Sequence, residues 1–304
     1  MYRIRFHGRG GEGMKTASRI LGTSFFLEGF EVQDAPRYGA ERRGAPVFAY
    51  VRASKHVINE RGVIHKPDLI VIADDSLISV IPETLFEGTD EKTVTLIISE
   101  NTIKELKIPL RQKENIITLS IKDRIQNYRS NLSTICASAA AGLLGVINIK
   151  NLEQGITEEL GELGSSQLSA NIDIARFLFK EMEPYNCPVG ESEDVSGEFP
   201  VTADWITLSL EQSGISTPSI RKTATSIKNR TGLWRTERPI INRELCSRCM
   251  LCNIYCPENV INNDSESYPE IDYEHCKGCL ICAEICPSHA IEKTDENLSI
   301  SEDG

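Results

Sequence analysis

Residues 246–257, CSRCMLCNIYCP, and residues 276–287, CKGCLICAEICP, carry the same pattern of four cysteines and a proline. The spacing in both copies is Cys-x2-Cys-x2-Cys-x3-Cys-Pro, and together they contain eight of the ten cysteines of the chain. A short apolar segment precedes each copy and another follows it, so the pattern belongs to an internal repeat. The sequence therefore predicts a small pseudo-twofold domain at residues 240–291.

The spacing within each copy indicates how the cysteines are used. Three cysteines separated by two residues wrap a tight loop around three corners of a cube, and the fourth points toward a second cube. This is the bacterial pattern for two [4Fe–4S] clusters, in which the fourth cysteine binds the other cluster. The following proline fixes the chain direction after the crossing ligand. We predict a small α+β domain of the bacterial 2[4Fe-4S] ferredoxin type, with ligands Cys246, Cys249, Cys252 and Cys286 for one cluster and Cys256, Cys276, Cys279 and Cys282 for the other.

Two other uses of the cysteines fit the pattern less well. A disulfide scaffold is typical of small secreted domains, whereas a reducing cytosol favours thiolate–metal chemistry. Structural zinc takes four ligands per ion, usually as two distant Cys-x2-Cys pairs. Zinc sites would not account for the eight cysteines at two identical spacings or for the proline that follows each copy. The other two cysteines stand alone in the sequence. Of these, Cys136 lies in an alanine-rich run and is expected to be a small buried apolar residue; the second is Cys187.

The composition excludes two other classes of protein. The chain has 304 residues, of which 40% are hydrophobic, and a formal net charge of −11. Nucleic-acid binding is not expected, because it needs clustered lysine and arginine. The N-terminus has no apolar signal segment, and the longest apolar stretch, residues 135–149, is too short to cross a membrane. We expect a cytoplasmic protein, with no membrane partner and about two domains.

Residues 1–183 are predicted to form a layered, Rossmann-like α/β domain. Strands are predicted at residues 2–7, 47–51, 69–73, 94–98 and 116–119, and most of these are apolar throughout, as in strands covered on both faces. Strands mixed with helices favour a layered domain. Helical patterns lie at residues 15–28, 132–146, 152–159 and 167–181.

The composition changes after this domain. Residues 184–204 are polar and acidic and are predicted to form a linker. Residues 205–239 show little periodicity, and their later part is rich in arginine and lysine. That part is either a solvated basic face or a strap that docks on another subunit or on the anionic cluster domain. Residues 292–304 are expected to form a frayed acidic tail.

A glycine-rich turn, GRGGEG at residues 8–13, separates the first predicted strand from the first predicted helix. Backbone amides at such a turn can bind an anion at the positive end of the helix. The glycines match the G-x-G-x-x-G pattern of dinucleotide-binding proteins, and Asp34 lies about where a ribose-binding acid is expected. Arg9 and Glu12 fit a pyrophosphate site poorly, and close packing of strand and helix is the alternative.

A second dense motif, PRYGAERRGAP, spans residues 36–46 and contains three arginines, one glutamate and two glycines. Either Glu41 organises the arginines into a structural network, or the arginines bind an anionic ligand through forked hydrogen bonds. The sequence leaves both interpretations open.

These motifs resemble a known family. The segment RFHGRGGEG at residues 5–13, followed by ERRGAP at residues 41–46, is similar to the gamma subunit of 2-oxoacid:ferredoxin oxidoreductases, the pyruvate synthase group. The segment GLWRTERP at residues 232–239 is similar to the small delta subunit of the same enzymes. The resemblance covers residues 1–180 and 205–290, nearly the whole chain, and implies a fused gamma–delta subunit. Family members commonly have glutamine where this chain has Glu12.

The resemblance implies that a 2-oxoacid is oxidised on thiamine diphosphate and Mg²⁺, which alpha and beta subunits would hold. The products would be acyl-CoA, CO2 and two electrons, which would pass through the delta clusters to a soluble ferredoxin. The subunits would assemble as a dimer of heterotrimers. No catalytic residue is expected in this chain, and Arg9, Arg42 and Arg43 become candidates for contacts with CoA phosphates or neighbouring subunits.

The resemblance favours pyruvate as the substrate, with oxalate and arylglyoxylates as alternatives that close relatives use. Two interpretations from other classes remain open. One is a stand-alone nucleotide-linked iron–sulfur reductase, in which the glycine turn binds the nucleotide. The other is a scaffold whose clusters only stabilise the fold.

Overall fold

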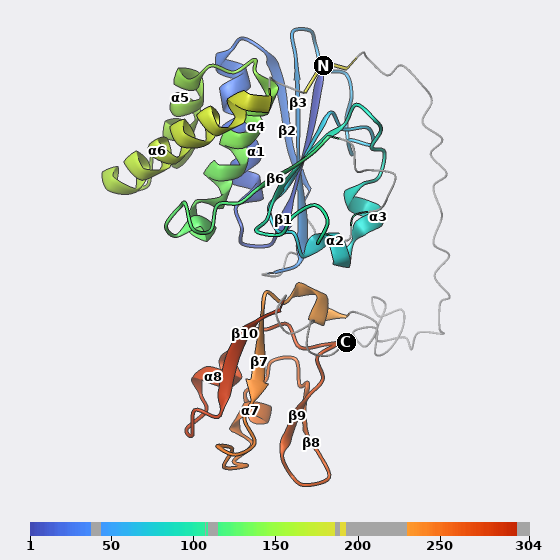
Figure 1. The fold of residues 1–304 in the computed structure, drawn as a ribbon, viewed down its shortest axis with the longest axis vertical. Helices are drawn as coiled ribbons and strands as arrows, with labels where there is room; N and C mark the ends of the chain where they lie inside the picture. The colour runs from blue at the N-terminus through green and yellow to red at the C-terminus, as the bar shows by residue number, and fades with distance from the viewer. Residues whose placement is uncertain (38–43, 107, 109–114, 186–188, 193–229, 297–304) are drawn as a thin grey trace, which may run out of the picture. The chain divides into compact units, whose positions relative to one another are not determined.

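The structure is a computed structural model, and it describes residues 1–37, 44–106, 108, 115–185, 189–192 and 230–296 (Figure 1). The chain divides into two compact units, Met1–Asp194 and Val195–Gly304. Within the described ranges, no helix is both long enough and apolar enough to cross a membrane.

The N-terminal unit is built on a six-stranded mixed sheet with the strand order β2-β3-β1-β4-β5-β6. β4 pairs with β1, β5 with β4 and β6 with β5, all in parallel. β3 runs antiparallel to both β1 and β2. The strands are β1 (Tyr2–Arg9), β2 (Glu31–Arg37), β3 (Pro46–Ser54), β4 (Leu69–Ile72), β5 (Val94–Ile98) and β6 (Ile116–Leu119).

Helices cover both faces of this sheet (Figure 1). On one face lie α1 (Met14–Leu27), α4 (Leu132–Leu144), α5 (Ile149–Leu160) and α6 (Ser165–Met182), and on the other lie α2 (Leu77–Val80) and α3 (Pro82–Leu85). A 3-10 turn, η2 (Tyr128–Asn131), precedes α4. Leu69 and Val71 of β4 pack in the core under the longer helices, whereas Ile70 and Ile72 pack with α2 and α3. Both faces of the strand are therefore buried, which explains its apolar sequence.

The predicted α/β layering is confirmed, and the predicted strands and helices lie close to the observed ones. The glycine turn starts later than predicted, because Gly8 and Arg9 still belong to β1. The sequence analysis missed β2. This strand contains Glu31, Asp34 and Pro36, which are residue types depleted in strands. β2 forms an edge of the sheet, where proline is tolerated because one side of the strand needs no hydrogen-bonding partner.

One face of β1 carries buried basic side chains. Arg3 and Arg5 are both 3% exposed. The Nε atoms of Arg3 and of Arg52 on β3 lie 3.0 Å and 3.4 Å from the same carboxylate oxygen of Glu60. Hydrogen bonds from Arg3, which outweigh the effect of burial, lower the pKa of Glu60. The carboxylate of Glu60 therefore stabilises two buried cations, which would otherwise lose their hydration without compensation.

Part of the predicted linker, residues 184–204, packs on the N-terminal unit. A 3-10 turn, η3 (Glu183–Tyr185), continues α6. Val189 is 3% exposed and belongs to the main core. The amino group of Met1 lies 2.7 Å from the Glu191 carboxylate. Within the predicted linker, Val189 therefore buries apolar surface and Glu191 pairs with the amino terminus.

The second unit contains two small antiparallel sheets, one formed by β7 and β10 and the other by β8 and β9. In the first, Ile291 pairs with Ile241 and Asp295 pairs with Glu237. The predicted boundaries at residues 240 and 291 cut through this sheet, because β7 starts inside the predicted strap and β10 continues into the predicted tail. The elements are η5 (Thr231–Trp234), β7 (Glu237–Ile241), α7 (Leu251–Ile254), β8 (Ile261–Asn263), β9 (Pro269–Ile271), α8 (Ile281–Glu284) and β10 (Ile291–Asp295). Residues 205–229 of the predicted strap lie outside the described residues.

Candidate functional site

The eight repeated cysteines surround two separate cavities in the second unit. Each cavity is lined by three cysteines of one copy and by the fourth cysteine of the other copy. The first cavity is lined by Cys246, Cys249, Cys252 and Cys286. The second is lined by Cys256, Cys276, Cys279 and Cys282. The structure thus brings together the two crossed sets of four that the spacing predicts, with every thiol free of a disulfide.

The cysteine loops of the two copies have the same backbone shape. Arg248 and Met250 of the first copy have φ angles of 59° and 57°, and their counterparts Gly278 and Leu280 have φ angles of 67° and 60°. Left-handed residues in such a loop turn successive backbone N–H groups into a concavity, which binds anions and iron–sulfur clusters in many proteins. Leucine and methionine adopt this conformation rarely, so its repetition indicates a constraint that both copies share.

Burial raises the pKa of three of these thiols. Burial raises the pKa of Cys252 and Cys276, and it raises that of Cys282 to about 12. Cys286 differs, because hydrogen bonds from Ser288 and from backbone N–H groups outweigh burial and lower its pKa. The N–H of Ala290 donates to its Sγ at 3.3 Å. Since metals bind the thiolate, iron has to displace a proton at each buried thiol.

The two cavities are walled by thiols and by apolar side chains. Among the described residues, no three histidine, cysteine, aspartate or glutamate side chains converge as ligands of a single ion. The four thiols of each set instead stand around an open space. Apolar side chains complete the walls, with Ile241 and Ile291 at the first cavity and Val260 and Ile281 at the second. Solvent access at such walls is one of the factors that set the reduction potential.

The glycine turn of the N-terminal unit is closed by its own side chains. The N–H of Arg9 donates to the Glu12 carboxylate at 2.6 Å, and the N–H of Glu12 donates to the carbonyl of Arg9 at 3.0 Å. Burial, together with the nearby carboxylate of Asp74, raises the pKa of Glu12 to about 7. The Glu12 carboxylate therefore already accepts the backbone N–H of Arg9, to which a phosphate would otherwise bind. This disfavours a dinucleotide at this turn.

The predicted ribose-binding acid is far from the turn. Asp34 pairs with Val51, and Val51 pairs with Ile4 on β1, so Asp34 stands at the level of Ile4. Arg9, at the carboxyl end of β1, lies five residues further along, or roughly 17 Å at 3.3–3.4 Å per residue. The structure therefore does not bring Asp34 together with the glycine turn, and the dinucleotide interpretation loses its second element.

Arg9 is held inside the protein. It is 2% exposed, and its Nε lies 3.0 Å from the Asp74 carboxylate. Its Nη1 donates to the carbonyl of Gly44 and its Nη2 to the hydroxyl of Ser76. The end of the arginine motif lies beside the glycine turn: the N–H of Gly10 donates to the carbonyl of Ala45, and the N–H of Gly44 donates to the carbonyl of Gly10. For Arg9 the geometry favours the structural role. Arg42 and Arg43 lie outside the described residues.

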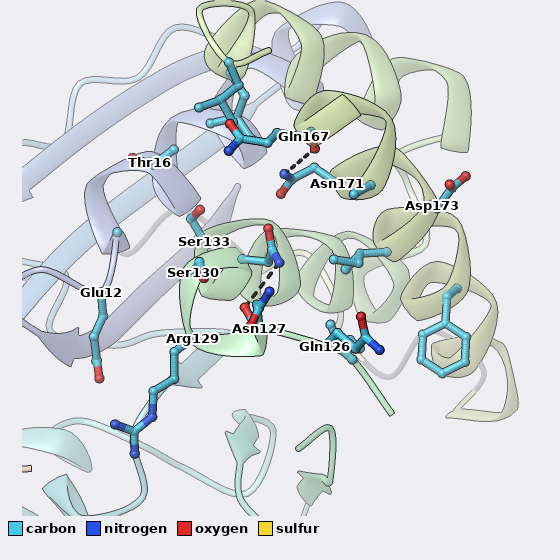
Figure 2. Close-up of a pocket in the computed structure, with 18 of the residues that line it drawn as sticks. Glu12, Thr16, Gln126, Asn127, Arg129, Ser130, Ser133, Gln167, Asn171 and Asp173 are labelled. Atoms are coloured by element: carbon cyan, nitrogen blue, oxygen red, sulfur yellow. Dashed lines mark hydrogen bonds between the residues drawn. The ribbon is translucent and has the colours of Figure 1, made fainter. Parts of the chain in front are cut away.

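A large cavity opens beside the glycine turn and was not predicted. Its volume is about 870 Å³. Figure 2 shows Thr16 of α1, Ser133 of α4 and Asn171 of α6 around the same space. Asn171 is 4% exposed and is held by Thr134 and by the carbonyl of Gln167. The lining offers many neutral hydrogen-bonding groups, but they come from α1, α4, α6 and the segment 124–131 before α4. Because these segments are far apart in the sequence, no linear motif marks the site.

The fold and the cysteine sets together define a class of protein in which an α/β domain is joined, in one chain, to an iron–sulfur domain. The chain belongs to the pyruvate ferredoxin/flavodoxin oxidoreductase family, whose model matches residues 3–177. A 4Fe-4S binding domain matches residues 269–292. The predicted family membership is confirmed, and with it the expectation of an oxidoreductase subunit that binds iron–sulfur clusters.

Curated relatives match the N-terminal unit over nearly their whole length. The gamma subunit common to the pyruvate and ketoisovalerate oxidoreductases of Thermococcus litoralis is 36% identical over 189 residues, which is 61% of this chain and 99% of that protein. Pyruvate synthase subunit PorC of Methanothermobacter marburgensis is 33% identical over 186 residues, which is 60% of this chain and 98% of that protein. Among solved structures, pyruvate oxidoreductase subunit PORC from Thermotoga maritima has 24% sequence identity with this chain and a TM-score of 0.48. The match covers 59% of this chain and 95% of the PORC chain.

Proposed function

We propose that this chain is the fused gamma–delta subunit of a thiamine diphosphate-dependent 2-oxoacid:ferredoxin oxidoreductase. In this proposal alpha and beta subunits hold thiamine diphosphate and Mg²⁺, and pyruvate with CoA is converted to acetyl-CoA and CO2. The two electrons leave through two [4Fe–4S] clusters of this chain to a soluble ferredoxin. The observation that carries the proposal is a gamma-family unit followed, in one polypeptide, by two crossed cysteine sets around two cavities.

The residues of the second unit fit the binding of these clusters. A [4Fe–4S] cluster, when bound, takes up and releases one electron. Four thiolates of this chain would hold each cluster, and backbone N–H groups of the loops would stabilise its negative charge. The N–H of Ala290, which donates to Sγ of Cys286 at 3.3 Å, supports this arrangement. The apolar walls restrict water, so that the potential depends on the protein as well as on the cluster.

CoA use and substrate identity are separate parts of the proposal. Pyruvate is favoured because it stands in the names of the two gamma-type relatives described above. The subunit of Thermococcus litoralis is common to a pyruvate and a ketoisovalerate enzyme. A shared gamma subunit is expected to leave substrate choice to the other subunits. Oxalate and arylglyoxylates remain alternatives, and oxalate oxidation needs no CoA. Arg42 and Arg43 are proposed as contacts for CoA phosphates or for a neighbouring subunit.

The test of the function is purification of the native complex under anaerobic conditions through a tag on this chain. Ferredoxin reduction is then assayed with pyruvate, 2-oxoisovalerate, oxalate and phenylglyoxylate, each with and without CoA. We expect two larger partners with bound thiamine diphosphate, and activity with one of the 2-oxoacids. A chain that purifies alone, carries flavin and reduces a nicotinamide would support the stand-alone reductase instead.

The arginine motif has its own test within the same complex. Replacing Arg42 and Arg43 together by alanine should raise the apparent KM for CoA at least tenfold or weaken assembly with the other subunits, because forked contacts to phosphate or carboxylate are lost. The matched control is Arg61→Ala, which removes an exposed arginine of the same unit. Unchanged KM and unchanged assembly would show that the motif has neither role.

A further inference from the structure

The two cysteine loops, although alike in backbone shape, have different surroundings. In the first copy, residues 243–249 are exposed except for Cys246, which is partly covered. In the second copy Cys276 is 9% exposed and most of its neighbours are partly covered. The cover comes from the segment that precedes the ferredoxin-like domain. The N–H of Gly232 donates to the carbonyl of Glu274 at 2.8 Å, and Thr231 donates to the carbonyl of His275.

Arg235 is the centre of this cover. Its side chain is 6% exposed, and its Nη1 donates to the carbonyls of Tyr273 at 2.5 Å and of Cys276 at 2.6 Å. The other edge of the guanidinium binds the Glu296 carboxylate, with Nε and Nη2 each 2.7 Å from a carboxylate oxygen. The positive charge therefore lies between the carboxylate and the cysteine loop.

Glycine at position 278 makes room for this arginine. A Cβ at Gly278 would lie 2.7 Å from Cγ of Arg235 and 2.4 Å from the carbonyl oxygen of Glu237. The counterpart in the first copy is Arg248, whose guanidinium lies 4.0 Å from the centre of the Tyr268 ring at the surface. The repeat thus places a buried cation against one cysteine loop and an exposed one near the other.

We propose that Arg235 makes the cluster held by Cys256, Cys276, Cys279 and Cys282 easier to reduce than the cluster held by the other four cysteines. Each cluster with four thiolates is anionic, and reduction adds a further negative charge. A fixed cation nearby stabilises that charge more strongly when it is shielded from water. A transferred electron then rests preferentially on the cluster beside Arg235.

This inference rests on the two clusters of the proposed function, but not on its substrate. The test is anaerobic redox titration of the full chain, with the hyperfine-shifted cysteine β-protons used to follow each cluster by NMR. Arg235→Gln should lower the equilibrium constant for one-electron reduction of the cluster beside it at least tenfold. This corresponds to a shift of its reduction potential by about 59 mV to lower values. The other cluster should shift less than half as much.

Two further variants separate charge from packing. Arg235→Lys keeps the charge and should retain most of the wild-type potential. Glu296→Gln removes the opposing carboxylate and should move the same cluster in the opposite direction, to higher potential. It also keeps the test available if Arg235→Gln loses the cluster. Arg243→Gln is the matched control, because it removes an arginine whose side chain is 57% exposed.

The outcomes distinguish the inference from the proposed function. Opposite shifts of one cluster for Arg235→Gln and Glu296→Gln support the inference. Unmoved potentials, or shifts of the same sign in both variants, overturn it while leaving the two clusters established. A chain that binds fewer than two clusters, by iron analysis, overturns the proposed function and the inference with it.

Discussion

Replacing Glu12 by glutamine should stabilise the N-terminal unit at alkaline pH and leave it almost unchanged in acid. In the folded protein, burial and the Asp74 carboxylate raise the pKa of Glu12 from its ordinary value of 4.5 to about 7. Between these two values the folded state binds more protons than the unfolded state, so stability falls as pH rises through this window. Below about pH 4.5 both states are protonated and Glu12 contributes no such loss.

The size of the effect follows from the width of the window. Each pKa unit corresponds to about 1.4 kcal/mol, so the full loss above pH 7 is about 3 kcal/mol. Glutamine carries no charge, and its side-chain oxygen can accept the N–H of Arg9 that now donates to Glu12 at 2.6 Å. The variant should therefore gain about 2–3 kcal/mol relative to the parent between pH 5 and pH 8.5.

Hydrogen exchange measured by mass spectrometry gives the change in unfolding free energy for the N-terminal unit alone, within a chain of two units. Peptides that cover β1 and β4 report the opening free energy of the sheet. Asp173→Asn is the matched control, because it removes a carboxylate that lines the same cavity but is 70% exposed. A difference between Glu12→Gln and parent that does not change from pH 5 to pH 8.5 would refute the reasoning, as would a pH-dependent gain of equal size in the control.

Two substitutions test packing at other positions. Gly278→Ala should lower the iron content from roughly eight toward four atoms per chain, because the added Cβ would lie 2.4 Å from the carbonyl oxygen of Glu237, in a loop where Gly278 has a φ of 67°. The control is Gly190→Ala, because a Cβ at Gly190 meets nothing within 4 Å. Equal iron content in both variants would contradict the account. Glu60→Ala should destabilise the N-terminal unit by about 3–5 kcal/mol, since it leaves the buried Arg3 and Arg52 without their carboxylate. Hydrogen exchange of β1 and β3 measures this loss, and a loss no larger than that of the exposed Glu83→Ala would count against it.

The cysteine sets could be predicted from sequence because spacing alone encodes them. Short fixed intervals force three thiols onto one loop, and the two identical copies imply the crossing of the fourth. The apolar strands β4 and β5 were predictable for a similar reason, since burial on both faces leaves a continuous apolar run. In both cases the signal lies within a few consecutive residues.

The remaining features depend on contacts between distant segments. The strand β2 was missed because pairing with β3, rather than its own residue types, holds Glu31–Arg37 in the sheet. Arg9 looked like a ligand-binding residue, but its partner Asp74 comes from the turn after β4, 65 residues later. The dinucleotide pattern was misleading because Glu12, a residue within the pattern, fills the anion position itself. The cavity beside the turn is lined by three helices and by residues 124–131, which no sequence periodicity links.

The most direct test of the central claim is electron paramagnetic resonance of the native complex, frozen after a 2-oxoacid and CoA are added without ferredoxin. The account predicts that pyruvate, or one of the alternative 2-oxoacids, produces the signals of reduced [4Fe–4S] clusters. It also predicts that Cys286→Ser and Cys256→Ser each alter one of the two cluster signals. Clusters that dithionite reduces but no 2-oxoacid does, in a complex that contains thiamine diphosphate, would contradict the claim that this chain carries electrons away from the oxidation of a 2-oxoacid.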